Sequence, residues 1–132
     1  MITKKKNIII WPCAMCEDED ILWIYHGQLN MLFSYNLNKR VVELECILEN
    51  EYIREASMVK VVKVDNKVYM IPFWGNHIHV YDIIKKEQKI IHMKLENEYE
   101  GKRIFCKAFE KNGVITCVPA NYHSIIRIDT KK

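Results

Sequence analysis

The string Leu48-Glu49-Asn50-Glu51-Tyr52 returns, residue for residue, as Leu95-Glu96-Asn97-Glu98-Tyr99, 47 positions further along the chain. A period of about 20 to 50 residues is typical of folds in which one supersecondary unit is copied several times. Laying the chain on itself at this spacing also pairs Pro72 with Pro119. The repeat therefore extends beyond the pentapeptide and predicts an array of similar units.

A shift of 46 positions brings an earlier copy into register, because Tyr35-Asn36 then falls on Tyr81-Asp82. The extra residue belongs to a predicted hairpin around residues 38–40. Three units follow from these two shifts, at residues 8–48, 54–95 and 101–132. We expect them to form a single repeat domain over residues 1–132.

Each unit begins with the pattern of a β-hairpin. In the second unit a β-branched run at residues 58–64 is followed by Asp65-Asn66 and a second apolar run. The third unit has Asn112-Gly113 at the same turn, and Asn-Gly is a strong hairpin signal because both central residues of a type I′ turn take positive φ. Glu19-Asp20 occupies this position in the first unit.

Two more strands complete the pattern of a unit. An alternating strand runs over residues 78–82, and after a polar hairpin a fourth strand is expected from Lys89 to Leu95. Each unit is therefore predicted to be a four-stranded antiparallel meander.

A four-stranded meander repeated every 46 or 47 residues resembles the blade of a β-propeller. The third strand, Val80-Tyr81-Asp82-Ile83, looks like the Tyr-Asp or Trp-Asp strands of kelch-like and WD40-like blades. The Gly-Gly pair of kelch repeats and the Gly-His pair of WD40 repeats do not occur at the corresponding positions, so the resemblance implies an architecture and no family's functional residues. The predicted fold is all-β, with about three four-stranded blades forming a half-propeller, and the alternative is a β-sandwich or an open barrel.

The third unit stops at residues 129–132, where its fourth strand should begin, so the last blade is expected to be incomplete. The stretch Asn7-Ile8-Ile9-Ile10 is a candidate for the missing strand, since strand exchange between chain ends protects sheet edges. Three blades are fewer than the roughly four that a closed propeller needs. We expect a homodimer that closes the ring, or a second propeller-forming chain, and the alternative is a truncated fragment of a longer propeller.

Composition excludes several classes of partner. The chain has 132 residues, of which 28% are charged, and a net charge of +3. Its basic residues form only short runs, the longest at residues 4–6 and another at residues 131–132, so it lacks the basic face that nucleic-acid binding requires. No stretch approaches the ~18 apolar residues of a membrane helix. The five cysteines are an odd number, which favours a cytoplasmic protein over a secreted disulfide framework.

Two groups of residues suggest metal or redox chemistry, but the repeat argues against both. Cys13 and Cys16 have the spacing of a redox dithiol or half a zinc site. Cys13 is equivalent to Val59 and Cys106, and Cys16 is equivalent to Val62 and Phe109. These equivalents indicate ordinary packing positions. His77 and His79 share one face of a strand, but the sequence places no acidic partner beside them. We therefore predict no catalytic residue, metal or cofactor.

The loops between the second and third strands carry the candidate site. In propellers this loop opens on the same face as the link between blades, and here it concentrates amides, histidines and aromatic rings, which suit a protein, peptide or glycan ligand. The predicted ligand-binding residues are Gln28, Asn30, Trp74, Asn76, His77, Asn121, Tyr122 and His123. The predicted function is a non-catalytic binding module. The alternative functions are an enzyme of the lactonase, lyase or glycosidase type completed by oligomerisation, or a fragment without a ligand. The alternative for the predicted ligand-binding residues is that they are simple turn residues.

Overall fold

The computed structural model describes residues 14–51, 57–93 and 102–132, which form eleven strands in three antiparallel sheets. The prediction of an all-β fold is confirmed. The first sheet contains β1 (Ala14–Asp18), β2 (Ile21–His26), β3 (Met31–Asn36) and β4 (Val41–Ile47). The second contains β5 (Met58–Val64), β6 (Lys67–Pro72), β7 (Ile78–Asp82) and β8 (Glu87–Ile91). The third contains β9 (Phe105–Lys111), β10 (Val114–Pro119) and β11 (Ile126–Asp129).

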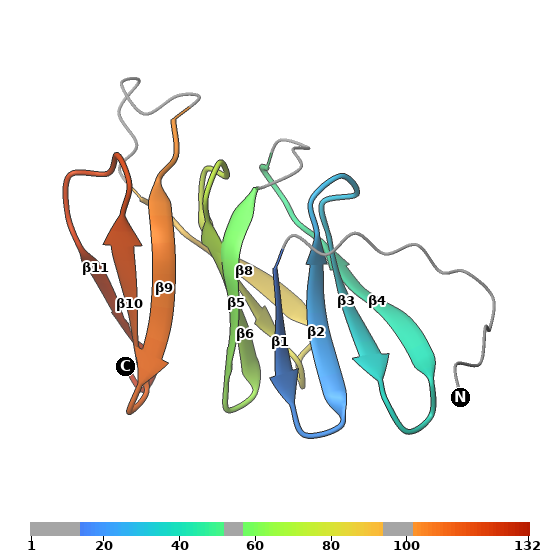
Figure 1. Cartoon of the computed structure of the whole chain (residues 1–132). Helices are drawn as coiled ribbons and strands as arrows, with labels where there is room; N and C mark the ends of the chain where they lie inside the picture. Colours follow the sequence, from blue (N-terminus) through green and yellow to red (C-terminus); the bar gives the residue numbers. More distant parts are fainter. Residues whose placement is uncertain (1–13, 52–56, 94–101) are drawn as a thin grey trace, which may run out of the picture.

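Each sheet is a meander in which consecutive strands are neighbours (Figure 1). The first hairpin of every blade turns where the sequence predicts. Positive φ angles occur there at Glu19 (53°), Asp65 (51°), Asn112 (53°) and Gly113 (79°). Aspartate and asparagine adopt this left-handed region more readily than most side chains, and glycine adopts it without steric cost, which is why these residue types stand at the second and third of these turns.

The predicted fourth strand of the second blade is wrong in its position. It was expected from Lys89, whereas β8 runs over Glu87–Ile91, and residues 94 and 95 lie outside the described part of the chain. The reason is a side-chain cap, since Asp82 Oδ1 accepts hydrogen bonds of 3.0 Å from the backbone N–H groups of both Ile84 and Lys85. This closes the turn two residues early and leaves Glu87 free to begin the strand.

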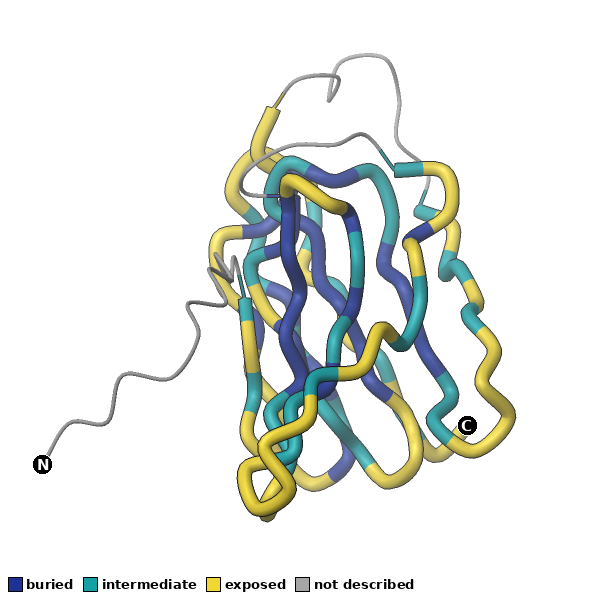
Figure 2. Tube along the Cα trace, turned by 90° about the vertical axis from the view of Figure 1, so that its right-hand side faces the viewer, coloured by how far each residue is buried: buried dark blue, intermediate teal, exposed yellow. Residues whose placement is uncertain are grey.

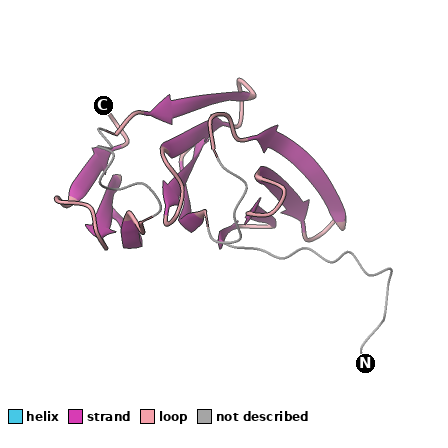
Figure 3. Cartoon of the chain, turned by 90° about the horizontal axis from the view of Figure 1, so that it is seen from above, coloured by secondary structure: helices cyan, strands magenta, loops and turns pink. Residues whose placement is uncertain are grey.

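The sheets pack face to face, with β1, β5 and β9 lying where neighbouring sheets meet. Seen from above they form an arc (Figure 3). One hydrophobic cluster joins the first and second sheets, and includes Trp23, Tyr25, Leu32, Leu48, Met58, Val61, Val68, Met70 and Tyr81. Another joins the second and third, and includes Val62, Tyr69, Ile71, Ile78, Val80, Ile104, Phe105, Ile115 and Cys117. Burial is greatest in the middle of the strands and least at the hairpin tips (Figure 2).

The third sheet has three strands in the described part of the chain, which confirms the prediction of an incomplete last blade. The candidate exchange strand at residues 7–10 lies outside the described residues, so it stays a prediction. Over the three described ranges, no helix has the length and apolar character of a membrane span.

Candidate functional site

The β2–β3, β6–β7 and β10–β11 loops lie at one end of the molecule, with the residues that flank the links between blades; we call this end the loop face (Figure 1, top). Backbone hydrogen bonds join loops to links. Leu48 N–H donates to the Asn30 carbonyl at 2.9 Å, and Phe73 N–H donates to the Ser57 carbonyl at 2.8 Å. Ile104 N–H donates to the Phe73 carbonyl at 2.7 Å, which ties the second blade to the third.

Glu51, in the link between the first two blades, holds the β6–β7 loop. Its carboxylate accepts hydrogen bonds from the backbone N–H groups of Asn76 at 2.8 Å and His77 at 2.7 Å. It also contacts His79 Nε2 at 3.0 Å, and both side chains are fully buried. All the groups around the carboxylate are N–H donors, so the loop forms a closed cradle for a buried carboxylate.

Gly75 lies in the same cradle because a side chain would not fit. Its N–H donates to the Ser57 carbonyl at 2.9 Å. A Cβ atom at this position would stand 2.9 Å from that carbonyl oxygen and 3.3 Å from a Glu51 carboxylate oxygen. The glycine therefore permits the close approach of loop and link.

Three histidine rings lie next to the cradle. The centroids of His77 and His79 are 6.3 Å apart, and those of His77 and His92 are 5.5 Å apart. Burial lowers the pKa of His77, an effect that nearby Glu51 opposes. The buried Nδ1 atoms of His77 and His79 have no hydrogen-bond partner among the described residues.

Glu51, from the link between the first two blades, is an acidic partner of His79 that the sequence alone did not place there. The pair is nevertheless closed to substrates by its burial. Among residues 14–51, 57–93 and 102–132, no three histidine, cysteine, aspartate or glutamate side chains are placed to hold a metal ion.

An arginine lies over two aromatic rings where the second and third blades meet. The guanidinium carbon of the exposed Arg103 is 5.2 Å from the Phe73 ring centroid and 5.4 Å from that of Trp74. The two rings meet edge to face at 5.7 Å. Arginine–aromatic contacts of this kind are attractive, and the half-buried Trp74 keeps part of its surface in solvent.

The β10–β11 loop completes this region. The Asn121 amide donates to the Arg103 carbonyl at 3.0 Å, so it positions the residue that covers the rings. The buried Tyr122 ring lies 4.4 Å from the exposed His123 ring. We name Phe73, Trp74, Arg103, Asn121, Tyr122 and His123 the junction patch.

The predicted residues of the first blade are not part of this patch. Asn30 is buried with φ of 54°, its amide donates to the Leu48 carbonyl at 2.9 Å, and its side-chain oxygen accepts from the Tyr25 hydroxyl at 3.1 Å. Gln28 is exposed in the same loop. The structure therefore divides the predicted residues into three groups, with Asn76 and His77 at the Glu51 cradle and Trp74, Asn121, Tyr122 and His123 at the junction.

Sequence reasoning missed Arg103 and did not recognise the role of Glu51. Arg103 follows an unrepeated stretch, and nothing in the sequence places it over Trp74. Glu51 carried a signal, because Glu98 repeats it in the second pentapeptide. Glu98 itself lies outside the described residues.

The cysteines behave in two ways. Cys117 is fully buried, which fits a packing role, and burial raises its pKa to about 12. Burial also raises the pKa of Cys16, whereas Cys13 lies outside the described residues. The packing role inferred from Cys106 and Phe109 is wrong for these two residues, because both are exposed on a face that no described sheet covers.

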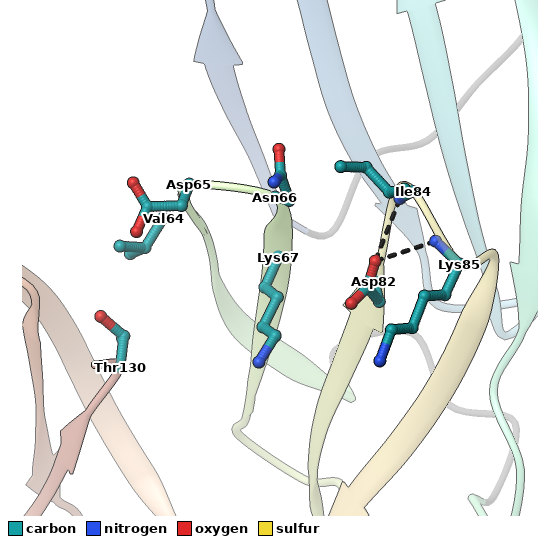
Figure 4. A pocket seen from close by; sticks show the side chains of 8 residues that line it. All are labelled: Val64, Asp65, Asn66, Lys67, Asp82, Ile84, Lys85 and Thr130. Carbon is teal, nitrogen blue, oxygen red and sulfur yellow. Dashed lines mark hydrogen bonds between the residues drawn. The ribbon is translucent and has the colours of Figure 1, made fainter. Parts of the chain in front are cut away.

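Hollows occur away from the loop face. One of about 300 Å³ lies at the hairpin end, between Asp65, Lys67 and Asp82 on one side and Thr130 on the other (Figure 4). Another of about 390 Å³ lies between β8 and the end of β11, with Tyr69, Ile91 and Ile128 in its wall. The second one borders β11, at the edge where a fourth strand of the third blade would pair.

The sequence matches no protein-family model and no curated protein. Solved structures resemble its fold. The chain superposes on the computationally designed Ika4 protein with a TM-score of 0.61 and 10% identity, over 90% of this chain and 66% of that one. For a chain of the Mitotic Checkpoint Complex the TM-score is 0.58 at 9% identity, over 100% and 43%. For Kluyveromyces lactis Hsv2 it is 0.52 at 10% identity, over 90% and 33%.

These likenesses and the three stacked meanders define the architecture as blades of a β-propeller. The chain spans just under two thirds of the Ika4 chain and less than half of the other two. At these identities the comparison describes the fold alone.

Proposed function

We propose that this chain is a non-catalytic interaction module that binds a segment of a partner protein at the junction patch. The observation that carries the proposal is the exposed Arg103 held over Phe73 and Trp74. Tryptophan, tyrosine and arginine dominate the binding energy of protein interfaces, because they combine large contact area with directed polar groups. Here all three residue types gather at one junction.

The chemistry of the patch favours one class of segment. Arg103 supplies a positive charge with N–H donors, and Trp74 supplies a flat apolar surface beside it. A carboxylate next to an apolar or aromatic side chain would satisfy both. We therefore propose an acidic peptide segment with an adjacent hydrophobic residue as the ligand.

Two further parts of the proposal concern the setting of the module. A ring of blades needs more than the three described sheets, so we propose that two chains of this protein work as a pair. The odd number of cysteines supports a reducing compartment such as the cytoplasm.

The test is selection of peptides from a random display library on the purified chain, followed by calorimetry with the enriched peptide. We expect an acidic–hydrophobic motif, and we expect Arg103→Glu and Trp74→Ala to weaken its binding about tenfold or more. The matched control is Lys85→Glu in the β7–β8 turn, which reverses another exposed charge at the opposite end and should leave affinity unchanged.

A glycan array probed in parallel separates the main alternative. Glycan binding that Trp74→Ala abolishes, without peptide enrichment, would replace the peptide proposal with a carbohydrate one. Peptides whose binding depends on Lys85 and not on Arg103 would refute the junction patch as the site.

A further inference from the structure

The first blade has an apolar face that no described sheet covers. Two rows of side chains cross this sheet and point away from the second blade. We call the face that they form the rear face of the blade. One row is Met15, Ile24, Phe33 and Leu44, and the other is Glu17, Leu22, Tyr35 and Val42. Met15 is 45% exposed and Leu44 is 52% exposed, whereas Ile24 in the same row is 5% exposed.

The equivalent positions of the second blade form a buried junction. Its rear face packs against the first blade through Val61, Val68, Met70 and Tyr81, which are 0 or 1% exposed. The first blade keeps apolar residues at these same positions. Its rear face therefore has the composition of a blade junction without a neighbouring blade.

The third blade has the complementary open face. Its front face, which points away from the second blade, carries Phe109 and Ile125, at 53% and 62% exposed. Lys111 and Arg127 stand beside them around an open hollow of about 470 Å³. In the first and second blades the front face is the one that packs against the next blade (Figure 3).

The charges at these two open faces match in a specific way. At the junction of the first and second blades, Asp18 on the front side forms a 2.7 Å ion pair with Lys63 on the rear side. By strand register, Lys111 occupies the position of Asp18, and Glu17 occupies the position of Lys63. Both charges are reversed, so a front face of the third blade set against a rear face of the first would again pair opposite charges.

We propose that the occupant of both faces is a second copy of this chain. Two chains of three blades then close one six-bladed ring, in which Glu17 of each chain faces Lys111 of the other. Each of the two junctions between chains joins the rear face of one first blade to the front face of the other chain's third blade, so no open face remains exposed. The inference rests on the proposed pairing of chains and is independent of any ligand of the junction patch.

The reversed charges permit a test by mixing. Glu17→Lys and Lys111→Glu each place like charges at both junctions, and we expect each variant alone to dimerise about tenfold more weakly at low salt. A mixture of the two variants places opposite charges at both junctions again. Sedimentation equilibrium should therefore find that the mixture pairs as tightly as the unaltered chain, whose particle mass should be twice 15.8 kDa.

Leu44→Asp tests the apolar part of the surface, and Ile84→Asp is its control. Ile84 is 70% exposed in the β7–β8 turn, away from both faces. We expect Leu44→Asp to give a monomer and Ile84→Asp to remain a dimer, with circular dichroism confirming that each is folded. If Leu44→Asp does not fold, the mixture of charge variants decides alone.

Three results would overturn the inference. In the first, the unaltered, folded chain is a monomer even at protein concentrations well above those used in the binding assays. In the second, it forms open polymers instead of a closed pair. In the third, the affinity of the dimer is the same for the Glu17→Lys variant, the Lys111→Glu variant and their mixture, which would mean that the chains pair through other surfaces. None of these results bears on peptide binding by Arg103, so the two proposals fail separately.

Discussion

Replacing Glu51 with alanine should strongly destabilise this protein, although Glu51 lies in the link between the first two blades and not in a strand. The carboxylate is the shared acceptor for two backbone N–H groups of the β6–β7 loop and for His79 Nε2. Both side chains of the Glu51–His79 pair are fully buried, and the backbone donors of Asn76 and His77 are partly buried.

The expected loss follows from the number of orphaned groups. Each buried donor left without a partner costs about 1–3 kcal/mol, and Glu51→Ala removes the acceptor of three donors. We take about 3–5 kcal/mol for Glu51→Ala, which is a large part of the roughly 5–15 kcal/mol by which domains are stable. At about 3–5 °C per kcal/mol for a chain of this size, the midpoint of thermal unfolding should fall by about 10–20 °C.

The assay is urea and thermal unfolding followed by circular dichroism, with amide hydrogen exchange at Asn76 and His77 as the local readout. Glu49→Ala is the matched control, because Glu49 is an exposed glutamate of the same pentapeptide whose N–H, and not its side chain, is hydrogen-bonded to Gln88. We expect the control to change stability by less than about 0.5 kcal/mol. If the two alanine variants unfold alike, or if the amides of the loop exchange no faster in Glu51→Ala, Glu51 does not hold the loop.

Four further predictions concern individual residues. Asn30→Ala should cost about 2–3 kcal/mol in urea unfolding, and Asn30→Gly about 1 kcal/mol less, because glycine tolerates the positive φ while losing the same two hydrogen bonds; equal losses would contradict this. Gly75→Ala should cost about 1–3 kcal/mol, since the added Cβ would stand 2.9 Å from the Ser57 carbonyl oxygen, and unchanged stability would refute the close approach. In the native protein a thiol reagent at pH 8 should modify the exposed Cys106 and spare Cys117, which should react only after unfolding. Burial raises the pKa of Cys117 to about 12, so above the ~8.5 of a free thiol the unfolded chain binds fewer protons and stability should fall between about pH 8.5 and 12; stability that rises over this interval would contradict the assignment.

The first hairpin of each blade was predictable because its signals are local. The turn residues Asp65-Asn66 and Asn112-Gly113 stand between β-rich runs, and the chain turns at both. The start of β8 was misplaced because it depends on one side chain, Asp82, accepting two backbone hydrogen bonds. Local polarity alone does not show which polar residue closes a turn.

The Glu51–His79 pair was not predictable, because comparison of the copies pointed elsewhere. The equivalent of His79 in the third blade is Ile126, which suggested apolar packing. His79 is indeed buried, but it contacts a carboxylate from 28 positions earlier in the chain. Comparison of repeat units reveals the features that the units share, whereas the Glu51–His79 pair occurs in one unit among the described residues.

Equivalence between copies also fails at the ends of the array. Phe109 corresponds to Val62, which is 8% exposed between the second and third blades, yet Phe109 is 53% exposed. The two positions have the same place in their strands and different neighbours. Burial in a repeat fold depends on the presence of the next unit, and no single unit encodes that.

The link between the first two blades also affects the order in which the blades unfold. Leu48 belongs to the hydrophobic cluster that the first two sheets share, and Glu51, three residues later, closes the loop of the second. A few residues therefore carry both the apolar and the polar coupling between neighbouring units. In the nearest-neighbour description of repeat proteins, such coupling makes adjacent units unfold together. In an unpaired chain, such as the monomer expected for Leu44→Asp, a blade at an open end has one such neighbour and the middle blade has two. Hydrogen exchange of that monomer should therefore report the lowest protection at the two terminal sheets and the highest at β5 and β6.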